Sequence, residues 1–255
     1  MKLHCLIRSV FLLIALLTAF SLGWSQAQSG LAPATAAKTA EKPKPEPFTT
    51  DTPDILRETQ LGVSHPGYTG LIWWIPIEFW QKSAADQGVP AEKTEQAFGP
   101  LREYTIVCVF AAKVSDLGAL DFLPAEAIEK NVALRDAAGR EYSPLKEISQ
   151  DAKNLAAIIK PVLSAAAGKA GENIQILFFP GRTKDGATLA DATRKGEFSV
   201  VVRNILEAPE TVYLFRLPLT SVLPPKYCPV GHERVNLNWD YCPWHGVALN
   251  SSTAH

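Results

Sequence analysis

The segment 228–246, CPVGHERVNLNWDYCPWHG, constrains the fold of this chain more than any other stretch. It has few aliphatic residues, so without a crosslink it buries too little apolar surface to hold a fold of its own. Its cysteines and histidines are spaced as C-x3-H, nine residues, C-x2-H. Zinc binds thiolate and imidazole in a tetrahedral set, which two short-spaced pairs on two turns commonly supply. We therefore expect a structural zinc ion bound by Cys228, His232, Cys242 and His245.

A disulfide between Cys228 and Cys242 is the alternative to the metal. Closing a loop of this length would contribute on the order of 3 kcal/mol, whereas a structural zinc site can contribute roughly 10 kcal/mol or more. The histidines favour zinc and an oxidising compartment favours the disulfide, so both stay open at this point. In either case we expect Trp239, Tyr241 and Trp244 to pack the segment against the rest of the protein.

The two cysteine segments resemble the knuckles of a zinc ribbon. Residues 241–249, YCPWHGVAL, match the aromatic-CP-x-x-G-x-x-L tail of that family, with His245 at the ligand position before glycine. Residues 227–231, YCPVG, stand for the first knuckle, which reads CP-x-C-G in zinc ribbons. There Gly231 takes the second ligand position and His232 follows one residue later. The resemblance is thus to a degenerate zinc ribbon, and it implies a small zinc-ribbon-like module at residues 223–249.

The N-terminal residues have the pattern of an export signal. Lys2 and Arg8 accompany an apolar run at residues 10–22, and SQA, ending at Ala27, supplies small residues for cleavage. We expect residues 1–27 to be a signal peptide, either cleaved or retained as an anchor. The apolar run is shorter than the roughly 20 residues that cross a bilayer. We therefore expect a periplasmic or secreted protein with no membrane span after cleavage.

The rest of the chain divides by composition. Residues 28–48 are rich in Pro, Lys and Ala and predict a disordered linker. Residues 250–255 predict a flexible tail. Between the linker and the cysteine segment, residues 49–222 predict a β-rich globular domain with helices.

Hydrophobic periodicity gives the elements of this domain. Apolar runs bounded by Gly, Pro or Asn predict strands at 70–80, 102–113, 173–179, 197–203 and 211–217, and a hairpin at 131–145. A 3.6-residue period predicts a helix at 149–167, capped by Ser149, stopped by Gly168 and kinked or split at Pro161. Shorter helices are expected at 90–98 and within 116–130. The fold class is therefore mainly β (α+β), a β-sandwich-like domain with helical insertions.

One face of this domain is a candidate ligand site. Alternation along the strand at 70–80 places Trp74, Glu78 and Trp80 on one face, which could bind a sugar ring or a cation. The plainer interpretation is that this face packs under the helix that follows. The polar loop at 180–196 is long, and long loops in compact domains are often functional and often merely mobile.

Composition and motifs restrict the function. The formal net charge is −1 and no Lys/Arg cluster is interleaved with aromatics, so we expect no nucleic-acid partner. The chain has no G-x-S-x-G, H-E-x-x-H or dinucleotide motif, which favours a protein that is not an enzyme. We expect a binding or assembly protein of the cell envelope, with a protein or other envelope partner. The alternatives are a metal-dependent enzyme or redox protein that uses the Cys/His cluster, and carbohydrate binding through the Trp face.

Overall fold

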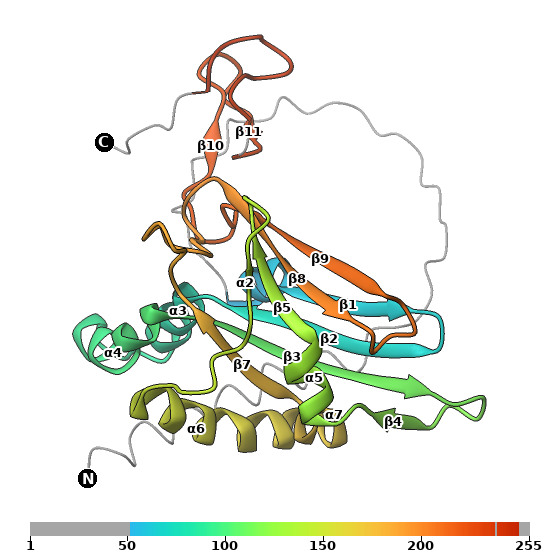
Figure 1. Ribbon diagram of the computed structural model, residues 1–255. Helices are drawn as coiled ribbons and strands as arrows, with labels where there is room; N and C mark the ends of the chain where they lie inside the picture. The colour runs from blue at the N-terminus through green and yellow to red at the C-terminus, as the bar shows by residue number, and fades with distance from the viewer. Residues whose placement is uncertain (1–51, 238, 250–255) are drawn as a thin grey trace, which may run out of the picture.

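A computed structural model of the chain describes residues 52–237 and 239–249. It confirms a mixed α+β fold, in which two antiparallel sheets lie face to face with helices around them (Figure 1). The expected signal peptide, linker and tail lie outside the described residues. None of the helices described combines the length and apolar character that a membrane span requires.

The first sheet is built around β3 (Tyr104–Val114). On one edge β3 pairs with β2 (Tyr68–Ile75), which pairs in turn with β1 (Gln60–His65). On its other edge β3 pairs with β7 (Gln175–Pro180) and, through its last residues, with β4 (Leu120–Phe122). The predicted central strand is thus confirmed, and its nearly continuous apolar run reflects burial on both faces.

The second sheet has the order β6-β5-β8-β9. The predicted hairpin is present in it, with its turn at Asp136. The Asp136 carboxylate accepts hydrogen bonds from the backbone N–H groups of Ala138 and Arg140 at 3.0 and 2.9 Å, and Gly139 has φ +80°. The strands of this sheet are β5 (Val132–Asp136), β6 (Glu141–Tyr142), β8 (Gly196–Arg203) and β9 (Glu210–Leu217).

Aromatic side chains join the two sheets. The indole of Trp74 on β2 makes edge contacts with Phe198 on β8 and Phe215 on β9, at ring-centroid distances of 5.0 and 6.0 Å. Phe198 and Phe215 stack on each other at 5.0 Å, with their planes 9° apart. These three side chains are buried, so they form part of the core between the two sheets.

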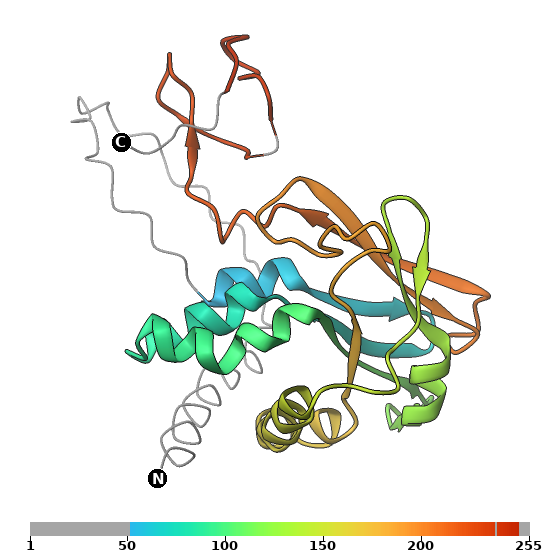
Figure 2. The same ribbon diagram turned by 60° about the vertical axis from the view of Figure 1, so that its left-hand side comes forward.

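Helix α6 (Gln150–Ala167) covers the face of the first sheet that is turned away from the second sheet (Figure 2). It begins as predicted, because the Ser149 side chain accepts a hydrogen bond from the Ala152 N–H at 3.2 Å, and it ends at Gly168 with φ +55°. The helix is not split at Pro161, which lies inside one continuous element. Its buried face spans the turns on both sides of the proline and packs on the core through Ala152, Leu155, Ile159 and Leu163.

The strand predicted at 70–80 is too long. β2 ends at Ile75, and Pro76, with φ −71° and no N–H for the ladder, precedes the first turn of α3 (Ile77–Asp86). Trp74 therefore lies on a strand, whereas Glu78 and Trp80 lie on a helix. The three residues do not form the single strand face that the alternation predicted.

The remaining helices are short. Those near the start of the described chain, α2 to α4, pack together at one end of the sheets (Figure 2). The predicted helix at 90–98 is confirmed and begins after Pro90. The elements are α2 (Thr52–Thr59), α4 (Ala91–Phe98), the 3-10 helix η2 (Gly99–Glu103), α5 (Ala125–Asn131) and α7 (Lys169–Glu172).

The aromatic contact between the sheets yields a stability prediction. Phe198→Ala should lower the free energy of unfolding by about 3–5 kcal/mol, because it opens a cavity beneath Trp74. Val212→Ala on β9, where the side chain is 47% exposed, should cost less than about 1 kcal/mol. Urea unfolding followed by circular dichroism measures both. Equal losses in the two variants would show that Phe198 is not part of the sandwich core.

Candidate metal centre

Residues 226–249, here called the C-terminal module, form a small unit that projects from one end of the sandwich (Figure 1). The strands β10 (Lys226–Tyr227) and β11 (Arg234–Val235) pair to form its hairpin. The module has its own hydrophobic cluster, separate from the core of the sandwich and made of Cys228, Val235, Cys242 and Leu249. Half of this cluster is cysteine, so the two thiols lie at the centre of the module.

Two turns of the same geometry carry the cysteines. The carbonyl of Cys228 accepts a hydrogen bond from the His232 N–H, and the Cys228 N–H donates to the Glu233 carbonyl, both at 3.0 Å. The carbonyl of Cys242 accepts one from the Gly246 N–H, and the Cys242 N–H donates to the carbonyl of the next residue, both at 2.8 Å. Each turn closes on a left-handed residue, with φ +59° at His232 and +63° at Gly246. The segments CPVGH and CPWHG are therefore structurally equivalent.

This equivalence explains which side chains reach the centre. His232 occupies the turn-closing position that Gly246 fills in the second turn, and its side chain is exposed. The position equivalent to His245 is Gly231 in the first turn. A Cβ atom there would lie 2.0 Å from Glu233 Oε2 and 2.5 Å from His245 Cε1. The carboxylate of Glu233 thus fills the space of the missing first-turn ligand.

Four donor groups converge between the turns, from Cys228, Glu233, Cys242 and His245. Glu233 Oε1 lies 3.1 Å from His245 Nδ1 and 3.2 Å from Cys242 Sγ. His245 Nδ1 lies 3.4 Å from Cys228 Sγ and 3.5 Å from Cys242 Sγ. All four donor atoms lie within 4.8 Å of one another. Bond lengths of 2.0–2.3 Å to a tetrahedral zinc imply ligand separations of about 3.3–3.8 Å, so the group is close enough to hold a metal ion.

Three of the four ligands expected from the sequence are therefore brought together, and His232 is not. Glu233 was missed, although comparing the two CP-x-x-x segments position by position would have shown that His232 aligns with a glycine. The backbone conformation of the turn, and not the number of residues after the cysteine, determines which side chain points to the centre of the module.

The charge of the four donor groups suits a bound cation. The hydrogen bond from its own backbone N–H lowers the pKa of Glu233, and the thiols of Cys242 and Cys228 and the ring of His245 lower it further. Burial raises the pKa of the Cys242 thiol. Both cysteines of the module are free thiols in the structure and are not bonded to each other. A divalent cation between the turns would favour the thiolates, because it supplies the positive charge that the buried sulfurs lack.

The aromatic residues of the module do not pack it against the sandwich, contrary to expectation. Trp239, Tyr241 and Trp244 are 38%, 66% and 63% exposed. Trp239 and Trp244 contact each other edge to face at 5.8 Å. The centre of the module is filled by its cysteines and aliphatic residues, so these rings stay on its surface.

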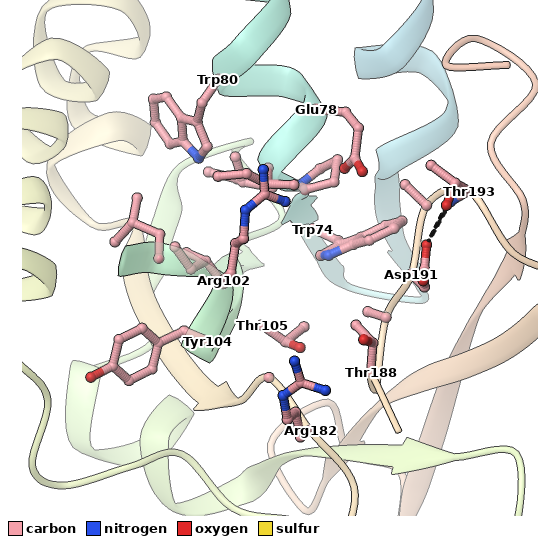
Figure 3. Close-up of a pocket in the computed structure, with 18 residues that line it drawn as sticks. Trp74, Glu78, Trp80, Arg102, Tyr104, Thr105, Arg182, Thr188, Asp191 and Thr193 are labelled. Carbon is pink, nitrogen blue, oxygen red and sulfur yellow. Dashed lines mark hydrogen bonds between the residues drawn. The ribbon is translucent and has the colours of Figure 1, made fainter. Parts of the chain in front are cut away.

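The three residues of the predicted ligand face, Trp74, Glu78 and Trp80, do not form a flat face but line a pocket. Although the residues come from a strand and a helix, all three line one pocket of about 410 Å³ (Figure 3). Arg102 and Arg182 also line it. They lie far from the tryptophans in the sequence, so strand periodicity could not have indicated the pocket.

Comparisons with protein-family models, with curated proteins and with solved structures found no match to this chain. The assignment of the centre therefore rests on its geometry.

The close packing at Gly231 is open to test. Gly231→Ala places a methyl group that overlaps the side chains of Glu233 and His245 and must displace them, so it should lower the affinity for Co²⁺ by at least about tenfold. Cobalt titration followed by the thiolate charge-transfer absorption measures this. Gly196→Ala, where a Cβ meets nothing within 4 Å, is the matched control and should bind Co²⁺ as the parent does. Unchanged affinity in Gly231→Ala would mean that Glu233 and His245 do not share the site.

Proposed function

We propose that Cys228, Glu233, Cys242 and His245 bind one zinc ion that holds the C-terminal module together. The observation that carries the proposal is the convergence of four donor atoms within 4.8 Å. Two thiolates, an imidazole and a carboxylate are all ligands that zinc accepts in tetrahedral sites. The resemblance to a zinc ribbon supports this choice of metal, with Glu233 in place of His232.

The metal has a structural role in this proposal. Four protein ligands fill a tetrahedral zinc site and leave no position for water or substrate. The thiols are buried beneath the turns, at 0% exposure for Cys228 and 1% for Cys242. The side chains of His245 and Glu233 complete the set from the surface, at 35% and 31% exposure. A site whose four positions are filled by protein supports a role in folding the module rather than in catalysis.

We further propose that the module serves in binding or assembly, as part of an exported protein of the cell envelope. Five of the ten large hydrophobic side chains that are exposed in the described residues belong to the module: Tyr227, Val230, Trp239, Tyr241 and Trp244. Trp and Tyr are enriched in protein–protein interfaces, where few residues carry most of the binding energy. The partner is therefore another protein. The export signal expected at residues 1–27 supports the location.

The metal prediction concerns zinc content. Protein purified without a metal-affinity tag should contain one zinc per chain by elemental mass spectrometry. Glu233→Gln and His245→Ala should lower zinc affinity by about 10–100-fold, because each removes one of four ligands. His232→Asn is the matched control, since asparagine accepts the left-handed backbone at that position, and it should retain zinc. Retention of zinc in Glu233→Gln and its loss in His232→Asn would show that His232, and not Glu233, is the fourth ligand.

The interaction prediction concerns the exposed aromatic rings. Tyr241→Ala and Trp244→Ala should change the free energy of unfolding by less than about 1 kcal/mol, because both side chains are largely in solvent. A photo-crosslinking amino acid at position 241, expressed in the source cells, should yield one defined cross-linked protein. The same amino acid at position 212, on the exposed face of β9, should not. Identical patterns from both positions, or none from position 241, would refute the proposed binding surface.

A further inference from the structure

The pocket beside α3 has the size and the construction of a ligand site. It is about 410 Å³ in volume, within the range of roughly 300–1,000 Å³ typical of small-molecule sites. Its walls come from the end of β2, the start of α3, the η2–β3 junction and the loop between β7 and β8. Figure 3 shows Trp74 and Trp80 on either side, with the guanidinium groups of Arg102 and Arg182 between and below them.

An unsatisfied hydrogen-bond donor lies at its wall. Trp80 is 7% exposed, and its indole N–H finds no acceptor among the described residues. In Figure 3 the nitrogen atoms of both indoles are on the ring edges turned toward the middle of the pocket. A buried N–H without an acceptor destabilises the folded state, so an acceptor supplied by a ligand would recover stability.

The charged groups of the pocket divide into paired and unpaired ones. The guanidinium of Arg102 donates to Glu95 at 3.2 and 2.9 Å, and the Asp191 carboxylate lies 3.5 Å from the guanidinium of Arg194. Glu78 and Arg182 have no oppositely charged side chain within ion-pair distance in the part of the chain that the structure describes. Arg182 instead donates to the Gly186 carbonyl at 2.9 Å. One negative and one positive group are thus left for a ligand.

Burial makes a positively charged partner for Glu78 more favourable. Desolvation raises the pKa of this carboxyl, and the nearby charge of Asp191 raises it further, while Arg102 acts in the opposite direction. A positive group placed beside Glu78 would replace the lost hydration of the carboxylate.

The pocket does not have the form of a sugar-stacking site. Trp80 stacks on Phe98 at 5.3 Å, with the ring planes 15° apart, and Trp74 packs edge to face on Phe198 and Phe215. Trp74 is 1% exposed and Trp80 is 7% exposed, so neither indole offers an open face on which a sugar ring could stack. The rings present their N–H edges, which suits a ligand with a hydrogen-bond acceptor.

We propose that this pocket binds a small zwitterion, of the size of an amino acid or a dipeptide, with its ammonium group at Glu78 and its carboxylate at Arg182. The indole N–H groups of Trp74 and Trp80 are additional donors to the carboxylate or to a carbonyl of the ligand. The proposal is independent of the zinc centre, which lies in the C-terminal module.

The experiment is isothermal titration calorimetry on the mature protein with zwitterions of increasing length. The probes are glycine, β-alanine, 4-aminobutyrate, 6-aminohexanoate and glycylglycine; butyrate and butylamine carry one charge each. At least one zwitterion should bind with one site per chain. The two singly charged analogues should bind at least about tenfold more weakly, because each leaves one of the two protein charges without a partner. Failure of every zwitterion at millimolar concentration, or equal binding of butyrate, would overturn the proposal.

Variants locate the binding in the pocket. Arg182→Gln and Glu78→Gln should each weaken the zwitterion at least about tenfold. Lys184→Gln, on the same loop but not lining the pocket, is the matched control and should bind as the parent does. Arg182 is exposed on a loop, so its variant keeps the test valid if Glu78→Gln fails to fold. Unchanged binding in Arg182→Gln would also overturn the proposal, whereas zinc content should be unaffected by every one of these variants.

Discussion

The contact of Trp74 with Phe198 and Phe215 is the interaction on which the rest of the sandwich depends. It joins β2 of the first sheet to β8 and β9 of the second, so it fixes how the two sheets face each other. Pro76 follows almost at once and ends the strand. The chain therefore leaves the core as a helix, and Glu78 and Trp80 turn to the side of Trp74 instead of continuing along its face. The packing of Trp74 and the end of β2 before Pro76 therefore determine both how the sheets pack and where the pocket lies.

The C-terminal module depends on a different constraint, the repeated CP-x-x-x turn. Each turn needs a left-handed residue at its fifth position, which in the first turn is His232. The side chain of His232 is exposed in that conformation, so it contributes no donor atom to the cluster. Glu233, the next residue, takes the vacant space over Gly231. The shift of one residue, from the expected His232 to the observed Glu233, thus follows from backbone geometry.

Local sequence patterns predicted most of the helices and strands. The features that they did not predict depend on contacts between segments far apart in the sequence. Strands β3, β7, β8 and β9, the β5–β6 hairpin and helix α6 were predictable because their apolar periods and the cap at Ser149 are properties of short segments, whereas β1 was not predicted. The end of β2 was not, because the aromatic run through Trp80 suits a buried helix as well as a strand. The convergence of Cys228, Cys242 and His245 was predictable from their spacing, whereas the place of Glu233 beside them required the turn geometry. The pocket was beyond prediction, since Arg182 reaches it from a loop whose position no local pattern determines.

The sandwich and the C-terminal module are stabilised separately, so the functions proposed for them can be tested separately. The sandwich has a continuous core, whereas the module buries mainly Cys228, Val235, Cys242 and Leu249. The ion pair of Lys195 and Asp240 joins the module to the β7–β8 loop, but both side chains are more than half exposed and such pairs contribute little. That loop also carries Arg182 to the pocket. Because its link to the module is weak and solvated, unfolding of the module would not displace Arg182, and the pocket would keep its charges.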